Sequence, residues 1–131
     1  MRVFIALKVP RGDPAREQIS ALLAEQVRLA GHTPFVAWEE ILRAGLTSPA
    51  EFMPFVRQAM LKSGLLLAAY HPELRGGLIE MGMAYAWDVP IWLLHPAGQV
   101  VSSSALGCAS RVSAYADLGD LRMQLQENFR I

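Results

Sequence analysis

Leu65-Leu-Leu-Ala-Ala-Tyr70 runs directly into His71-Pro-Glu-Leu-Arg-Gly-Gly-Leu-Ile-Glu80. The first segment is a continuous apolar run, which is typical of a parallel strand buried on both faces. The second opens with turn-forming residues and leads into a segment, Gly77–Trp87, that is predicted to be helical. A buried strand, a loop and a helix in this order form one unit of an α/β fold.

The same alternation extends toward the start of the chain. Val3–Leu7 is another apolar run and predicts a central buried strand. Asp13 is a suitable N-cap for a helix that Gly31 would end. Thr33–Trp38 predicts the second strand, in which Pro34 would be tolerated near the beginning or at an edge of the sheet.

The pattern also continues toward the end of the chain. Ser48–Glu51 has the form of a capping box, and Pro54 means that the helix it starts either kinks or restarts. Ile91–Leu94 and Arg111–Tyr115 are predicted to be the last two strands. Asp117 would cap the final helix.

Composition excludes several classes of protein. Twelve Lys and Arg balance twelve Asp and Glu, so no strong field favours nucleic acid or an anionic membrane. The longest apolar runs are far shorter than the roughly 20 residues that span a bilayer. The single Cys108 cannot form an internal disulfide, and no signal-type segment is evident, so we expect a cytoplasmic protein.

The apolar content points to self-association. Hydrophobic residues make up 53% of the chain, and its mean hydropathy is +0.25. These values are high for a protein of 131 residues, and burial of apolar surface against another subunit would explain them.

Candidate functional residues follow the predicted strands, because ligands of open parallel sheets bind at the carboxyl ends of the strands. Four loops carry suitable side chains: Lys8–Asp13, Trp38–Glu40, His71–Glu80 and His95–Ser104. In the third loop, Gly76 and Gly77 would let a ligand approach the backbone at a helix start that favours anions. Alternatively, the two glycines simply turn the chain.

Glu80 is the strongest candidate for chemistry. We place it in the first turn of its helix, where the dipole and free N–H groups would lower its pKa and keep it ionised. Such a carboxylate can attack an anomeric carbon and form a covalent glycosyl-enzyme intermediate. The competing interpretation is a carboxylate that only stabilises the helix.

Several segments together match a known family. They are Pro10-Arg11-Gly12, Leu65–Ala69, Gly76-Gly-Leu-Ile-Glu-Met-Gly-Met-Ala-Tyr-Ala86, Asp88-Val-Pro-Ile-Trp-Leu93 and Gly98–Ser104. The chain thereby resembles the nucleoside 2-deoxyribosyltransferases and their relatives, the 2'-deoxynucleoside 5'-phosphate N-hydrolases. The distinctive core of the match is Glu-x-Gly-x-Ala, from Glu80 to Ala84.

The resemblance implies a fold. Together with the alternation of strands and helices, it predicts one α/β domain over residues 1–131, a flavodoxin-like or Rossmann-like three-layer sandwich. The expected sheet has five mainly parallel strands in the order 2-1-3-4-5, because right-handed crossovers leave few alternatives.

The resemblance also implies roles for individual residues. Glu80 corresponds to the family's nucleophile, which displaces the base from C1'. Arg11 corresponds to an arginine on the phosphate side. Ser102 corresponds to a serine that reaches the 5'-phosphate from the neighbouring subunit, so that Ser102 or Ser104 would approach the partner's site in a homodimer or a larger homo-oligomer.

The chain departs from the family at several positions, among them Ser63-Gly64, where the family usually has Ala-Asp before the third strand. Phe4 stands where a tyrosine lies near the nucleophile, Val56 near an aspartate that handles the leaving base, and Leu74 where a second serine binds phosphate. Possible replacements for the acid are Glu39, Glu40, His71 and Glu73. Trp38 or Tyr70 could stack on the base.

These observations lead to three hypotheses. The first is cleavage or transfer of an N-glycosidic bond in a nucleoside or nucleotide through Glu80, without a cofactor and without a metal, since no Cys/His cluster is evident. The second is a nucleotide-binding or regulatory domain of the same fold with impaired catalysis. The third, a cytokinin-activating phosphoribohydrolase, is the weakest, because the longer Pro-Gly-Gly-x-Gly-Thr signature is absent.

Overall fold

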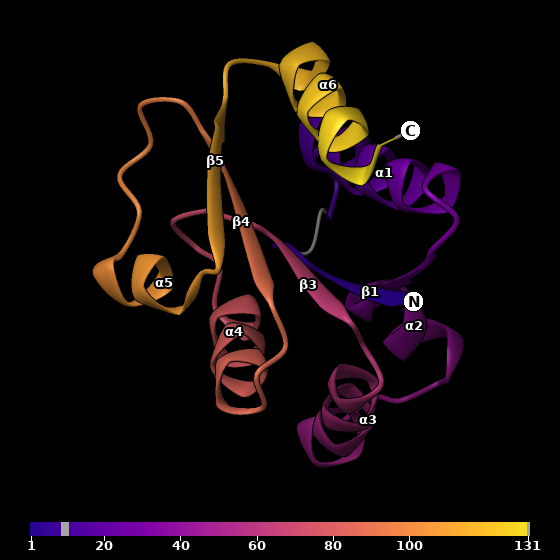
Figure 1. The fold of residues 1–131 in the computed structure, drawn as a ribbon. Coiled ribbons are helices and arrows are strands. Elements are labelled where there is room, and N and C mark those ends of the chain that lie inside the picture. Colours follow the sequence, from indigo (N-terminus) through magenta and orange to yellow (C-terminus); the bar gives the residue numbers. More distant parts are fainter. Residues whose placement is uncertain (9–10, 131) are drawn as a thin grey trace.

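The computed structural model describes residues 1–8 and 11–130, and in this part of the chain five parallel strands form one sheet (Figure 1). The strand order is β2-β1-β3-β4-β5, as predicted. The parallel register places Val3 opposite Pro34 on one side and Leu65 on the other. The strands are β1 (Arg2–Ala6), β2 (Thr33–Val36), β3 (Leu65–Ala69), β4 (Ile91–Pro96) and β5 (Arg111–Tyr115).

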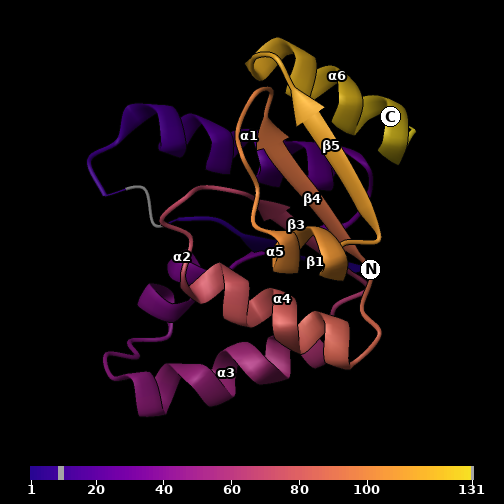
Figure 2. The same cartoon turned by 90° about the vertical axis from the view of Figure 1, so that its left-hand side faces the viewer.

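Helices cover both faces of the sheet (Figure 2). They are α1 (Pro14–Leu29), α2 (Ala37–Arg43), α3 (Pro49–Leu61), α4 (Gly76–Ala86), α5 (Ser103–Cys108) and α6 (Leu118–Phe129). Helices α1 and α6 pack on one face, and α3, α4 and α5 lie together on the other. None of the described helices is long and apolar enough to cross a membrane.

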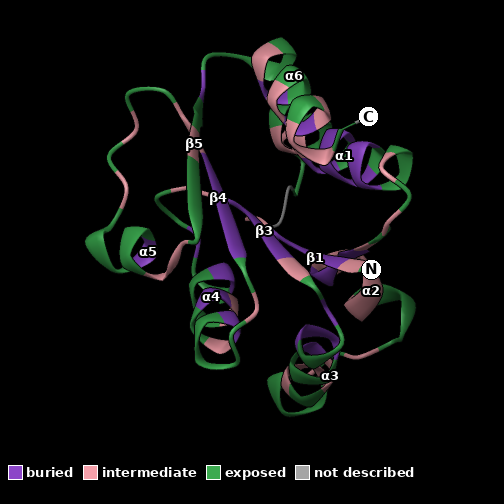
Figure 3. Cartoon of the chain, viewed as in Figure 1, coloured by how far each residue is buried: buried purple, intermediate pink, exposed green. Residues whose placement is uncertain are grey.

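Two apolar layers hold the sandwich together, one on each face of the sheet. Along β1, Val3 and Ile5 point toward α1 and α6, whereas Phe4 and Ala6 point toward the opposite layer, because side chains alternate along a strand. The central strands are therefore buried on both faces, which explains their continuous apolar runs (Figure 3). The edge strand β5 is the exception, with Val112 exposed.

Local capping interactions set several helix starts where the sequence predicts them. The Asp13 carboxylate accepts hydrogen bonds from the backbone N–H groups of Ala15 and Arg16. Ser48 and Glu51 form the predicted capping box, and α3 then continues through Pro54 as one helix rather than restarting there. Capping of this kind stabilises a helix by about 1 kcal/mol.

The structure corrects the predictions in two segments. Strand β2 ends at Val36 and α2 begins at Ala37, so Trp38 lies on a helix and not at the end of a strand. The segment His95–Ser104 was expected to be a loop, but β4 extends to Pro96 and the short helix α5 begins at Ser103. Both differences arise from short segments that lack the apolar periodicity of a longer helix.

Candidate functional site

The candidate site lies at the carboxyl ends of the strands, between β1 and β3. After β1 the chain enters α1 on one face, and after β3 it enters α4 on the other, which makes this the point where the winding of the sheet reverses. Open α/β sheets commonly bind ligands at such a point. Here a Lys8–Glu73 ion pair, with Nζ 3.1 Å from Oε2, joins the segments that follow β1 and β3.

Glu80 belongs to this edge, but it is one residue farther along α4 than predicted. The helix begins at Gly76 with Arg75 as N-cap, and its first turn contains no acidic residue. The Glu80 carboxyl turns back toward the helix start, since a Cβ atom added at Gly76 would lie 3.9 Å from Glu80 Oε1. The side chain therefore reaches back to the N-terminal end of α4, at the carboxyl ends of the strands.

The surroundings of Glu80 raise its pKa, which reverses the prediction of a lowered value. Glu80 is half-buried as a residue, but Oε2 is buried and has no hydrogen-bond partner among the described residues. Because burial removes water without supplying a donor, the pKa of Glu80 rises to about 8. The helix dipole acts mainly on the first turn and does not offset this loss of solvation. In the isolated chain, Glu80 is therefore mostly protonated at neutral pH.

The two glycines at the start of α4 have different surroundings. A Cβ atom at Gly77 would lie 2.5 Å from Leu74 Cδ1, and Leu74 is buried. Gly77 is thus required for close packing of the preceding loop onto α4. The side chain of Leu74 occupies the space beside Gly77 where a ligand was predicted to approach the backbone. Gly76 is exposed, and its nearest neighbour across the open side is the Glu80 carboxyl.

Side chains of the neighbouring loops form a hydrogen-bonded border. His71 Nδ1 accepts a hydrogen bond from the Glu73 backbone N–H at 3.0 Å. Tyr70 Oη accepts from the Ser102 backbone N–H at 3.3 Å, which connects the end of β3 to the loop after β4. Ser102 Oγ accepts from the Ala105 N–H as the N-cap of α5.

Three other predicted site residues lie on other segments than α4, the helix that carries Glu80. Ser104 lies exposed on α5, and Arg11 lies exposed in the turn that contains Gly12. Pro10, which belongs to the same motif, lies outside the described residues. Trp38 packs against the layer under α1 and α6, on the face opposite α4, and its Nε1 is buried without a hydrogen-bond partner among the described residues.

The positions that depart from the family are part of the core. Phe4 is buried, with its ring centroid 5.1 Å from that of Phe35, and Val56 is buried in the layer under α3. Glu40 was expected to be a replacement acid, but it pairs with Arg43 on the same helix. It also lines a hollow beside Arg2, at the amino end of β1, so the structure does not bring it to Glu80.

Sequence analysis missed one cation at this edge of the sheet. Arg16 lies in the first turn of α1, its Nε is 3.4 Å from Asp13 Oδ2, and that nitrogen is buried without a hydrogen bond to any described residue. Burial raises the pKa of Tyr115, at the end of β5, and the nearby Arg16 guanidinium partly offsets this rise. This electrostatic interaction links segments about a hundred residues apart, so the local sequence gives no signal for it.

His95 lies near the end of β4. Its Nδ1 hydrogen-bonds the Pro96 carbonyl oxygen at 2.9 Å. Within residues 1–8 and 11–130, no group of three or more His, Cys, Asp or Glu side chains is arranged to hold a metal ion.

Comparison with solved structures identifies the fold. The CMP N-glycosidase BcmB of Clostridium botulinum superimposes with a TM-score of 0.77 at 18% identity, covering 98% of this chain and 99% of that one. This chain has the nucleoside 2-deoxyribosyltransferase-like fold. The 2-deoxyribosyltransferase of Bacillus psychrosaccharolyticus gives a TM-score of 0.68 at 17% identity, covering 95% of this chain and 96% of that one. BlsM gives 0.70 at 22% identity, covering 98% of this chain and 89% of that one.

These likenesses are structural. No family model and no curated protein matches the chain by sequence. The deoxyribosyltransferase-like fold is therefore retained over most of the chain at identities of 22% or less.

Proposed function

We propose that the protein cleaves or transfers the N-glycosidic bond of a nucleoside or nucleotide, with Glu80 as the nucleophile. The observation that carries the proposal is a buried carboxyl oxygen with no hydrogen-bond partner among the described residues, at the edge of the sheet where this fold is expected to bind ligands. The solved structures with the same fold include a CMP N-glycosidase and a 2-deoxyribosyltransferase.

In the proposed reaction, a Glu80 carboxylate oxygen attacks C1' of the sugar. A C1'–O bond forms, and the C1'–N bond breaks with its electron pair going to the base, which then takes up a proton. Water or a second base attacks C1' of the glycosyl ester in the next step and releases Glu80. The transition state carries positive charge on the sugar ring, and a poorly solvated carboxylate stabilises such charge strongly.

The raised pKa of Glu80 agrees with a site in which the bound substrate supplies hydrogen-bond donors to the carboxyl group. Glu80 must be ionised to attack, and burial in the isolated chain favours its neutral form. Hydrogen-bond donors of a bound sugar that reach the Glu80 carboxyl group would stabilise its ionised form and lower the pKa. His71 and Glu73 remain the candidates for assisting the departing base, since both lie in the loop before α4.

The proposal includes a homodimer or a larger homo-oligomer with composite sites. Apolar side chains are exposed on α4 beside Glu80, namely Leu78, Ile79 and Tyr85, and Leu106 is exposed on the adjacent α5. Burying this surface against a second copy would bring exposed loop residues such as Ser102 and Ser104 toward a neighbouring site. The expected cytoplasmic location remains a prediction.

A binding or regulatory domain with impaired catalysis is the second candidate. The buried apolar side chains of Phe4, Val56 and Leu74 favour it, because they occupy positions where the resembled family has polar groups. This candidate predicts nucleotide binding at the same edge of the sheet without release of base.

Base release from a panel of nucleosides and 5'-monophosphates, followed by chromatography, tests the proposal. The wild-type protein should release free base, and Glu80→Gln should lower that rate by at least about 10³-fold while remaining folded, because the attacking oxygen is lost. Glu127→Gln, which removes an exposed carboxylate on α6, is the matched control and should retain full activity.

The other outcomes are equally informative. An active Glu80→Gln protein would refute the nucleophile. Binding without any base release would support the regulatory domain, and neither binding nor release would contradict both candidates.

A further inference from the structure

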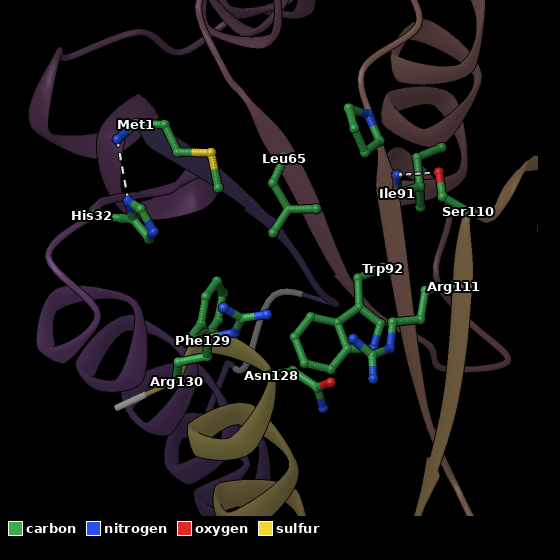
Figure 4. A pocket seen from close by; sticks show the side chains of 11 residues that line it. Met1, His32, Leu65, Ile91, Trp92, Ser110, Arg111, Asn128, Phe129 and Arg130 are labelled. Carbon is green, nitrogen blue, oxygen red and sulfur yellow. Dashed lines mark hydrogen bonds between the residues drawn. The ribbon is translucent and has the colours of Figure 1, made fainter.

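A second hollow of about 360 Å³ lies at the opposite edge of the sheet from Glu80 (Figure 4). The amino ends of β3, β4 and β5 and the end of α6 border it. Its lining residues are Met1, His32, Leu65, Pro90, Ile91, Trp92, Ser110, Arg111, Asn128, Phe129 and Arg130. Glu80 follows the carboxyl end of β3, so the sheet separates this hollow from the proposed active site.

Aromatic and aliphatic side chains form one wall of the hollow. Trp92 and Phe129 lie with their ring centroids 5.8 Å apart, and Leu65 faces them across the opening (Figure 4). Trp92 Nε1 donates a hydrogen bond to Ser113 Oγ at 2.9 Å, which fixes the orientation of the indole ring. This wall offers an apolar surface for the flat body of a ligand.

Two arginines supply positive charge at the rim. The Arg111 guanidinium lies over the Trp92 ring, 4.8 Å from its centroid, and Arg130 follows the last turn of α6. No Asp or Glu lines the hollow. Across residues 1–8 and 11–130, no Asp or Glu carboxylate lies within 4.0 Å of either guanidinium. Neither guanidinium is therefore neutralised by a described Asp or Glu side chain.

We propose that this hollow binds a small aromatic anion, with its ring against Leu65 and Phe129 and its anionic group at Arg111 and Arg130. An inorganic anion alone would leave the apolar wall uncovered, and a neutral aromatic molecule would leave the guanidinium groups unpaired. The volume is at the lower end of the range for small-molecule sites, which favours a ligand with a single ring. The proposal is independent of any reaction at Glu80.

Titration with benzoate, followed by two-dimensional NMR of the ¹⁵N-labelled full chain, tests this assignment. Benzoate should bind with a millimolar Kd, as is typical of so small a ligand, and should shift the signals of Arg111, Asn128 and the Trp92 indole N–H. Benzamide has the same ring without the charge and should bind at least about 10-fold more weakly. Phenyl phosphate in place of benzoate shows whether the site prefers a phosphate or a carboxylate.

Substitutions that remove only the charge complete the test. Arg111→Met and Arg130→Met should each weaken benzoate binding markedly, and together by at least about 10-fold, without changing the binding of benzamide. Arg122→Met, an exposed position on α6 that does not line the hollow, is the matched control. Arg130 lies at the exposed end of α6, so its variant keeps the test valid if Arg111→Met does not fold.

Several results would overturn the proposal. They include equal binding of benzoate and benzamide, benzoate shifts confined to the Glu80 edge of the sheet, and unchanged binding in both arginine variants. Absence of benzoate binding at about 50 mM would overturn it as well.

Discussion

Glu80 shows how one side chain can link stability to pH. Its pKa is about 8 in the folded chain against an ordinary value of 4.5. Below pH 4.5 both the folded and the unfolded states hold the proton, so the group has no net effect there. As pH rises toward 8, the unfolded chain releases this proton more readily, and the contribution of Glu80 to folding stability falls.

Glu80→Gln should therefore remove part of the pH dependence of the free energy of unfolding. We expect the variant and the wild type to be similarly stable near pH 4.5 and the variant to be more stable by roughly 2 to 4 kcal/mol near pH 8.5, because the amide remains neutral. Urea unfolding at a series of pH values measures the difference. Glu127→Gln should give parallel curves, and parallel curves for Glu80→Gln would show that the carboxyl is well solvated.

At the scale of elements, the packing of the His71–Arg75 loop on α4 depends on Gly77, which has no side chain. Gly77 leaves the space that Leu74 fills, so the loop can lie directly against the helix that carries Glu80.

Gly77→Ala should lower the free energy of unfolding by about 1 to 3 kcal/mol, because the new methyl group overlaps Leu74 in a buried position. Gly82→Ala in the same helix is the control. Nothing lies within 4 Å of the added methyl there, so this variant should gain about 0.5 to 1 kcal/mol from improved helix propensity. Denaturant titrations of both variants provide the measurement. A neutral Gly77→Ala would mean that Leu74 moves aside at little cost.

At the scale of the whole molecule, apolar side chains remain exposed on two neighbouring helices of one face. Ile79 is 56% and Tyr85 60% exposed on α4, the helix that carries the candidate nucleophile. Large exposed apolar side chains on neighbouring helices are typical of a subunit interface.

Ile79→Lys should therefore convert a dimer into a monomer, because a charged side chain would be buried at the contact. Light scattering at micromolar concentration measures the change. Met123→Lys on α6, where the methionine is 53% exposed on the opposite side of the sheet, should leave the mass unchanged. If the wild-type protein is already monomeric, the composite site is wrong and its second wall must come from the same chain.

The sequence predicts much of the fold because the relevant signals are local. Apolar runs locate the central strands β1, β3 and β4, and capping residues such as Asp13, Ser48 and Asp117 mark helix starts. The strand order follows from the alternation of elements, from right-handed crossovers and from the family resemblance. Helices α2 and α5 were missed, because six or seven residues provide too few turns for an apolar period to be evident.

The amino-acid sequence by itself determined which residues follow which strands, and therefore that Glu80 and the His71–Arg75 loop lie at one edge of the sheet. Only the tertiary structure decided the chemical state of that site. It raises the pKa of Glu80, places Leu74 in the space beside Gly77, and brings the Arg16 guanidinium near enough to Tyr115 to affect its pKa. Solvation and charge depend on atoms that packing brings together from distant parts of the chain, whereas strands and helix caps depend on neighbours a few residues away.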